Sequence, residues 1–352
     1  MTAEPSEVQL IRAQAHMHHA YLLGLQLMVS TRRGPEVMGK WMYRLFRRQH
    51  QEKFLSSFEK LGLNTLPHAI ACAQYHVLSN NMGGVDVEYM EENARKAWVR
   101  FRYPRWMYHG ATLCGIPLEV SRGFLEGWYA HNGVTLKNPH LGFVCVSEDM
   151  TGEFGLCGYF REFDHELAPE ERLQFAKEEL PPPFDATQQP SPPANQWNTV
   201  RLAKARRNYA LEYIRNGLCE LAGVIGEDET RRLGGLSARL IGLQYFQETA
   251  AMVNARDDGL NDAAAYLTRM FIGMGDTATC KLGKTEVQIE QQGLRVLRGL
   301  AEDERNLVLG CWAEIWVGTM RAQRQLKTLT WEAADDQVTW RSTALTDRAR
   351  LT

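Results

Sequence analysis

The sequence lacks any strong excess of charge. Lysine and arginine together number 40, and aspartate and glutamate number 42, which gives a net charge of −2 at pH 7. Because nucleic acids and acidic membranes attract basic surfaces, this balance argues against both kinds of partner. The sequence also lacks a run of about 20 apolar residues and the basic start of a secretory signal. Together these absences predict a cytoplasmic protein with no membrane segment.

Motifs of several large enzyme classes are missing as well. The chain contains no GxSxG, Walker, Rossmann or HExxH sequence, and His16, His18 and His19 are expected to face solvent. The seven cysteines form no CxxC pair, which argues against a zinc ribbon. Their odd number favours free thiols over a disulfide framework. With 44% apolar and 23% charged residues, the chain has the composition of a folded globular protein.

A proline-rich segment divides the chain near its middle. Six of the 13 prolines lie between Pro181 and Pro193, in a stretch with almost no apolar periodicity. Proline fixes φ and removes a hydrogen-bond donor, so such a stretch is typical of an extended spacer. We therefore expect a first unit at residues 1–178, a linker at residues 179–199 and a second unit at residues 200–352.

The two halves show the same order of expected elements, summarised as helix, helix, hairpin, helix, hairpin. The matched landmarks are Gly34 with Gly226, Gly83 with Gly275, and Trp128 with Trp312. The first two pairs are 192 positions apart and the third 184, because the first half carries the extra segment YPRWMYHGATLCG. These nearly constant offsets predict an internal duplication whose copies pack as a pseudo-symmetric pair.

Two expected strands of the first half carry charged candidate site residues. Period-two alternation places Asp86 and Glu88 on one face of the first strand, and Arg100 and Arg102 on one face of the next. A hairpin would join them as cross-strand ion pairs, which suffices for a structural role. In the functional alternative, Glu88 is a general acid or base, and Asp86 and the two arginines bind a substrate that carries a carboxylate.

Aromatic and histidine side chains of the first half form a second group of candidates. Tyr75, Trp106 and Trp128 are expected to bind substrate, and His76 and His131 are expected to act as catalytic acid or base. Trp106 belongs to the segment that the second half lacks. Such a segment is typical of a lid, of one wall of an aromatic pocket, or of a dimer contact.

A resemblance to known families follows from the end of the first half. A helix with Gly123-Phe124 and Gly127-Trp128 leads into a closing hairpin with Cys145, Glu148, Gly152-Glu153 and Cys157. This pattern resembles the 4-vinyl reductase-like domain and the related L-2-amino-thiazoline-4-carboxylic acid hydrolase family. The resemblance extends over both halves. It implies an α/β (α+β) fold of two tandem units, each an antiparallel sheet covered by helices, packed as a pseudo-dimer.

The resemblance also implies a metal site in the first unit. Domains of this type in phenol-responsive regulators bind aromatic effectors beside a zinc ion held by cysteines and an acid. The matching candidates are Cys145, Glu148 and Cys157, with Cys114 as a further ligand. The sequence departs from the pattern, since Cys114 precedes its helix and Trp340 and Arg341 stand where the second unit needs its last cysteine. Zinc is thus expected in the first unit alone, and buried core thiols are the alternative.

These features together predict a small-molecule enzyme. All ten histidines precede residue 179, so the first unit is expected to hold the site and the second to act as scaffold. We expect a hydrolase or lyase acting on a small aromatic or carboxylate-bearing compound, with a homodimer as a candidate assembly. The alternatives are a binding or sensor protein without catalysis and an accessory subunit of a catabolic enzyme.

Overall fold

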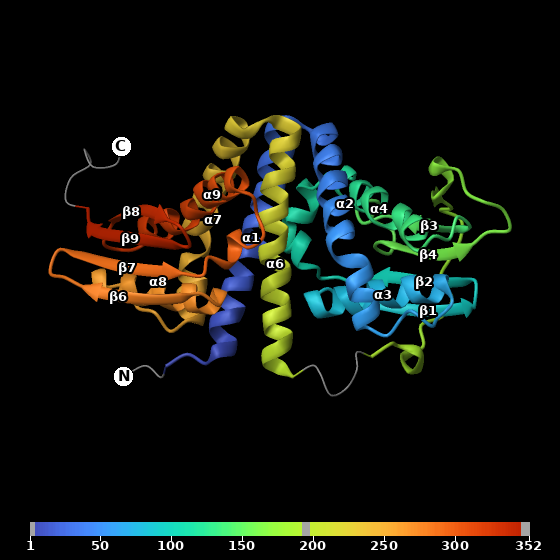
Figure 1. Cartoon of the computed structure of the whole chain (residues 1–352), viewed down its shortest axis with the longest axis horizontal. Helices are drawn as coiled ribbons and strands as arrows, with labels where there is room; N and C mark the ends of the chain where they lie inside the picture. The colour runs from blue at the N-terminus through green and yellow to red at the C-terminus, as the bar shows by residue number, and fades with distance from the viewer. Residues whose placement is uncertain (1–3, 192–197, 346–352) are drawn as a thin grey trace. The chain divides into compact units, whose positions relative to one another are not determined.

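The chain folds into a mixed α+β structure (Figure 1), seen in a computed structural model that describes residues 4–191 and 198–345. The first half contains α1 (Glu7–Arg33), α2 (Pro35–Lys60), α3 (His68–Gly83), β1 (Val87–Asn93), β2 (Lys96–Phe101), α4 (Glu119–Gly127), α5 (Asn132–Thr135), β3 (Leu141–Ser147), β4 (Cys157–Glu162) and β5 (Leu173–Phe175). Short 3-10 helices in this half are η1 (Trp106–Tyr108), η2 (Gly110–Gly115), η3 (Tyr129–His131), η4 (Pro169–Glu171) and η5 (Ala186–Gln188).

The second half contains α6 (Thr199–Ile225), α7 (Glu227–Met252), α8 (Leu260–Met274), β6 (Thr277–Leu282), β7 (Glu286–Gln292), η6 (Arg295–Leu297), α9 (Glu302–Arg321), β8 (Lys327–Ala334) and β9 (Gln337–Ala344). Within the described ranges, none of the helices has both the length and the apolar character needed to cross a bilayer.

The repeated order of elements expected from the sequence is present. Each half runs through three helices, a hairpin, a helical segment and a second hairpin, where the helical segment is α4 with the short α5 in the first half and α9 in the second. The predicted unit has one helix fewer before its first hairpin. The sheets have the orders β1-β2-β4-β3-β5 and β6-β7-β9-β8, so the first four strands of each follow one arrangement. Neighbouring strands are antiparallel apart from β5, which pairs parallel with β3.

Glycines mark equivalent positions in the two halves. Gly34 and Gly226 have φ of 83° and 85° at the junctions between consecutive long helices. The left-handed residue that ends the third helix is Gly84 in the first half and Gly275 in the second, with φ of 86° and 88°. Gly84 therefore takes the place predicted for Gly83, at an offset of 191. Glycine suits these positions because a side chain strains positive φ.

Close helix pairs in both halves also depend on glycine. A Cβ atom on Gly127 of α4 would lie 2.5 Å from the carbonyl oxygen of Tyr43 on α2. In the second half, a Cβ atom on Gly242 of α7 would lie 2.0 Å from the carbonyl oxygen of Ile315 on α9. Backbone atoms cannot rotate away as a side chain does. The close approach of α2 to α4, and of α7 to α9, therefore requires glycine at these two positions.

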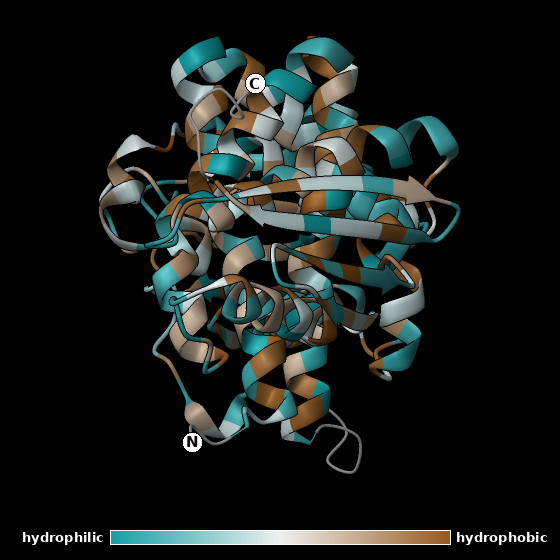
Figure 2. Cartoon of the chain, turned by 90° about the vertical axis from the view of Figure 1, so that its left-hand side faces the viewer, coloured by the Kyte–Doolittle hydropathy of each residue, from teal (hydrophilic) through white to brown (hydrophobic). Residues whose placement is uncertain are grey.

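The sheets carry the predicted alternation. In the first half, Trp98, Val144 and Tyr159 pack together on one face, whereas Phe160 lies under α3 on the other, where it stacks on His76. In the second half, α8 packs on the sheet, with the rings of Phe271 and Trp340 stacked 5.4 Å apart. Figure 2 shows hydrophobic and hydrophilic residues alternating along strands of this second sheet.

Contacts group the chain into two compact units whose boundaries differ from the predicted ones. One unit comprises Met1–Met28 with Thr199–Thr352, and the other comprises Val29–Asn198. Most of α1 thus packs with the second half of the chain. The hydroxyl group of Tyr21 donates a hydrogen bond to the carbonyl oxygen of Gly234 at 3.0 Å. The side-chain amide of Gln14 donates one to the carbonyl oxygen of Met270 at 2.6 Å.

The position of α1 corrects the expectation for the N-terminal histidines. His18 is fully buried instead of facing solvent, and its ring lies against Trp312 of α9. His19 is partly buried, and burial lowers its pKa to about 3. The reason is that three successive turns of α1 are covered by the helices of the second half.

The described part of the proline-rich segment does not form a free spacer. Gln189 accepts a hydrogen bond from the backbone N–H of Tyr89 at 2.9 Å and donates one to its carbonyl oxygen at 2.7 Å. These bonds hold the segment along β1, the edge strand of the first sheet. Residues 192–197, within the predicted linker, lie outside the described residues.

Candidate functional site

The predicted ion pairs between the first two strands form around Glu88. The register places Glu88 directly opposite Arg100. Its carboxylate oxygens lie 3.4 Å from Nε of Arg102 and 3.7 Å from Nη1 of Arg100. Asp86 is exposed, and its carbonyl oxygen accepts the backbone N–H of Arg102. A carboxylate of the protein itself therefore lies between the two arginines that were expected to bind a substrate.

Glu88 and His76 lie on opposite faces of the first sheet. Arg100, which shares the face of Glu88, pairs with Cys157 on the next strand. Cys157 belongs to the side-chain cluster of Trp98, whereas His76 stacks on Phe160 of the other face. The two predicted catalytic groups are thus separated by the sheet and do not meet at one substrate atom.

The predicted aromatic residues Tyr75 and Trp128 do surround His76. Their rings lie 5.1 and 6.0 Å from the His76 ring, and that side chain is 2% exposed. His50, which sequence analysis missed, lies 5.6 Å from the Trp128 ring. Trp128 Nε1 is buried and donates to no described group. These side chains form an aromatic core cluster between α2, α3 and η3.

Asn132 links the histidines of this cluster. Its amide nitrogen lies 3.0 Å from Nε2 of His76, and it also interacts with His50 and Cys72. Burial lowers the pKa of His76 and brings that of His50 to about 3. Burial likewise lowers the pKa of His131 to about 4, so all three rings are neutral and weakly basic near pH 7. The cluster can hydrogen-bond, but it is poorly matched to proton transfer at that pH.

The segment found only in the first half is anchored by a buried ion pair. Arg105 donates to Asp149 at 2.6 Å, and both side chains are at most 4% exposed. Asp149 also accepts from Tyr103 at 2.8 Å and from Ser121 at 2.7 Å. Trp106 follows Arg105 at the start of η1. Asp149, another residue that the sequence analysis missed, therefore fastens this segment to the connection after β3.

The predicted metal ligands are distributed over different places. Cys145 lies opposite Gly158, so it is on the other sheet face from Cys157. Glu148 is paired with Arg122 at 2.9 Å and with Lys177 at 3.7 Å. Cys114 is exposed in η2. Within residues 4–191 and 198–345, no three His, Cys, Asp or Glu side chains form a group able to hold a metal ion.

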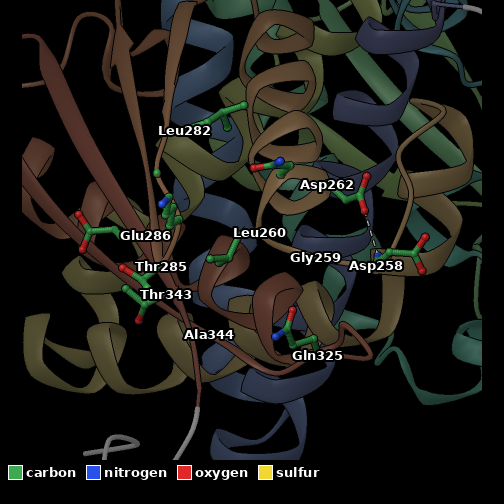
Figure 3. A pocket seen from close by; sticks show the side chains of 13 residues that line it. Asp258, Gly259, Leu260, Asp262, Leu282, Thr285, Glu286, Gln325, Thr343 and Ala344 are labelled. Carbon is green, nitrogen blue, oxygen red and sulfur yellow. Dashed lines mark hydrogen bonds between the residues drawn. The ribbon is translucent and has the colours of Figure 1, made fainter.

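A hollow of about 1100 Å³ lies between the start of α8, the turn from β6 to β7 and the end of β9 (Figure 3). Two of its acidic residues, Asp258 and Asp262, already have partners. Asp262 accepts the backbone N–H of Asp258 at 3.2 Å, drawn as a dashed line in Figure 3, and Asp258 is paired with Arg256. We find no converging set of polar groups in this hollow among the residues described.

A second cavity, of about 570 Å³, contains converging cations. We call it the basic pocket, and it is lined by Glu7, Leu10, Ile11, Lys204, Arg207, Asn208, Ile272, Gly275 and Arg295. These residues come from α1, α6, α8 and the start of η6, elements of one compact unit. A volume of about 300–1,000 Å³ is typical of small-molecule sites. Neither end of the chain alone could form it.

Two arginines meet at the floor of the basic pocket. A Cβ atom on Gly275 would lie 2.8 Å from Nη1 of Arg207 and 3.0 Å from Nε of Arg295, so both nitrogens approach one point. Arg207 is 4% exposed and donates to the carbonyl oxygen of Gly273 and to the side chain of Asn208. Nε of Arg295 is buried and bonds to no described group. Gly275 has no side chain, and this leaves room for the two guanidinium groups to pack beside it.

The pair of arginines is electrostatically unfavourable by itself. Burial and the adjacent Arg295 lower the pKa of Arg207 to about 10. The nearby carboxylate of Asp276 opposes this effect. Asp276 accepts the backbone N–H of Arg295 at 3.0 Å and the side-chain amide of Gln291 at 2.7 Å. An anion placed between the two guanidinium groups would reduce their repulsion.

Sequence analysis missed the basic pocket because it assigned the second half a scaffold role. A signal was nevertheless present, since Arg207 precedes Leu211, Ile214 and Leu218 at spacings of four, three and four. It thus continues the apolar stripe of α6, where a charged residue needs a buried partner. The other half of the pocket, from α1, has no comparable signal.

No family model, curated protein or solved structure matches this chain. The resemblance to the 4-vinyl reductase-like domain therefore stays a prediction from the sequence.

Proposed function

We propose that the protein binds a small organic anion in the basic pocket. The observation that carries this proposal is that Arg207 and Arg295 meet beside Gly275 in the lining of one cavity. Two neighbouring positive charges in a partly buried site are stabilised by a bound anion. A carboxylate-bearing ligand and a binding role without catalysis were both considered from the sequence. The site, however, lies in the unit that contains the second half and not in the first unit.

The donors of the pocket support binding of an anion. Arg295 is partly exposed and its Nε bonds to no described residue, so its guanidinium group has donors that the protein does not use. A guanidinium group matches the two oxygens of a carboxylate or phosphate group. Lys204 at the rim is already paired with Glu7 at 2.8 Å. Arg295 is therefore assigned the direct contact with the ligand.

The proposal can be tested with simple anions. Hexanoate, benzoate and inorganic phosphate would be titrated into the full chain by calorimetry, in buffers without chloride, with thermal unfolding followed in parallel. A ligand that binds the native state raises its stability by about 2.7 kcal/mol at a hundred times its Kd. We expect saturable binding of at least one anion, and loss of that binding in Arg295→Gln.

Arg324→Gln is the matched control. Arg324 belongs to the same compact unit and is 84% exposed, and it does not line the basic pocket. This variant should bind the anions as the wild type does. If none of the three anions binds, or if Arg295→Gln binds them unchanged, the proposed function is wrong.

A further inference from the structure

We infer that the anion of the basic pocket is a monocarboxylate with an apolar body, an inference that rests on the proposed function. The pocket combines a small cationic floor with apolar walls. Leu10 and Ile11 of α1 and Ile272 of α8 line it beside the arginines. A ligand that fills the pocket must therefore present a charged end and an apolar remainder.

The apolar walls are fixed in place by close helix packing. A Cβ atom on Gly273 would lie 2.3 Å from the carbonyl oxygen of Leu10, so α8 and α1 approach each other closely at this point. Leu10 and Ile11 are 9% and 2% exposed. Ile272, by contrast, is 44% exposed although its side chain is wholly apolar. An apolar ligand chain that covers Ile272 would remove this surface from water.

The size of the pocket argues against an inorganic anion as its proper ligand. The cavity measures about 570 Å³. One water molecule accounts for about 30 Å³ of liquid, and a four-oxygen anion replaces only a few of them. Such an ion would leave the walls formed by Leu10 and Ile272 in contact with water. An organic acid would place its charged group at the arginines and its apolar part against the apolar walls.

The charge of the pocket corresponds to a monoanion. The cations that line it are Lys204, Arg207 and Arg295. Two carboxylates, Glu7 and Asp276, act on Arg207 from nearby. The difference between three positive and two negative groups is one positive charge. Lys204, Glu7 and Arg298 are exposed to solvent, which screens them, and the paired Lys204 and Glu7 cancel. Arg207, Arg295 and Asp276 alone also leave one positive charge.

The hydrogen-bond donors that remain free in the pocket also favour a ligand with a single negative charge. Arg207 already uses Nε and Nη2 on Asn208 and Nη1 on the carbonyl oxygen of Gly273. Lys204 is paired with Glu7. The guanidinium group of Arg295 is therefore the principal group left for a ligand, and one guanidinium group suits one carboxylate group. A dicarboxylate would leave its second group against Leu10 or Ile11, where burial of a charge is unfavourable.

A homologous series of acids tests this inference. Acetate, butanoate, hexanoate and inorganic phosphate would be titrated into the full chain by calorimetry. Each methylene that becomes buried contributes about 0.8 kcal/mol, which corresponds to about a fourfold lower Kd. We expect hexanoate to bind at least tenfold more tightly than acetate or phosphate.

Two apolar positions provide a matched pair of variants. Ile272→Gln should reduce the advantage of hexanoate over acetate severalfold, because it replaces part of the apolar wall. Leu240→Gln, which replaces a side chain of similar exposure (47%) on α7 outside the pocket, should leave that advantage unchanged. Equal affinity for acetate, phosphate and hexanoate would overturn the inference while the proposed function stands. Failure of all these anions to bind would overturn both.

Discussion

Trp312 on α9 donates its indole N–H to Nε2 of His18 on α1, over a distance of 2.8 Å. On the other side of the ring, Nδ1 of His18 lies 2.8 Å from the carbonyl oxygen of Gln14, which can only accept. His18 therefore carries its proton on Nδ1, and its neutral form uses both ring nitrogens. Burial lowers the pKa of His18 to about 4, so protonation would break the bond to Trp312.

This arrangement predicts a loss of stability in mild acid. The unfolded chain protonates His18 near pH 6.5, whereas the folded chain does so near pH 4, so the unfolded state binds more protons between these values. The free energy of unfolding should fall as pH decreases through this window, and His18 accounts for a loss of about 2 kcal/mol by pH 5. Urea unfolding at pH 7.5 and pH 5 measures the change.

Two variants isolate the contribution of His18. His18→Gln should unfold more easily at pH 7.5 but lose less stability on transfer to pH 5. His165→Gln removes a histidine whose side chain is 61% exposed, so it should keep the pH dependence of the wild type. An equal pH dependence in all three proteins would contradict the role assigned to His18.

Glycine at the crossing of α7 and α9 gives a second prediction. Gly242→Ala would place Cβ 2.0 Å from the carbonyl oxygen of Ile315, and the backbone must move to admit it. We expect a loss of at least about 2 kcal/mol, measured as a lower melting temperature. On the same helix, a Cβ atom on Gly235 would meet only Cγ of Glu314, at 3.5 Å. Gly235→Ala should be neutral or stabilising, because alanine favours helix over glycine by about 1 kcal/mol; similar effects of the two variants would contradict this packing.

The local elements of this fold could be predicted from the sequence because their signals are local. Alternation in the segments from Val87 and from Lys96 identified the first hairpin, and the same register then placed Glu88 beside Arg100. The helix α1 shows the limit of such reasoning. Its apolar residues indicate that it packs on something, but only the folded chain shows that Tyr21 reaches Gly234 of the other half. Periodicity records which side of a helix is buried and contains no information on its neighbour.

The candidate site depended on distant contacts and was less predictable. His76, Tyr75 and Trp128 do meet, because they occupy the buried sides of elements that were expected. Their chemistry was not evident, since burial lowers the pKa of His76 only once its neighbours are in place. The basic pocket joins Arg207 to Leu10, residues almost 200 positions apart. Such a site has no sequence spacing by which to recognise it.

The ion pair between Arg105 and Asp149 gives a third prediction. Both side chains are at most 4% exposed, so Asp149→Asn would leave a buried guanidinium group without its counter-charge. Loss of one member of a buried pair costs about 3–5 kcal/mol. The exposed pair of Arg95 with Asp164 is the control, and Asp164→Asn should cost less than about 1 kcal/mol. Denaturant unfolding of both variants makes the comparison, and equal losses would be evidence against the anchoring role of Asp149.

The cysteines supply the last prediction, which separates core thiols from reactive ones. Burial raises the pKa of Cys145, and it raises that of Cys157 to about 12, so neither has a significant thiolate fraction near pH 8. Cys114 is exposed. We expect a thiol-specific disulfide reagent to modify Cys114 rapidly in the native protein, and to reach Cys145 and Cys157 only after denaturation. The phase due to Cys114 should disappear in Cys114→Ser, and peptide mass analysis would distinguish it from modification of the partly exposed Cys219 and Cys280. Rapid labelling of Cys145 or Cys157 in the native chain would show that these strands open to solvent and do not form a closed core.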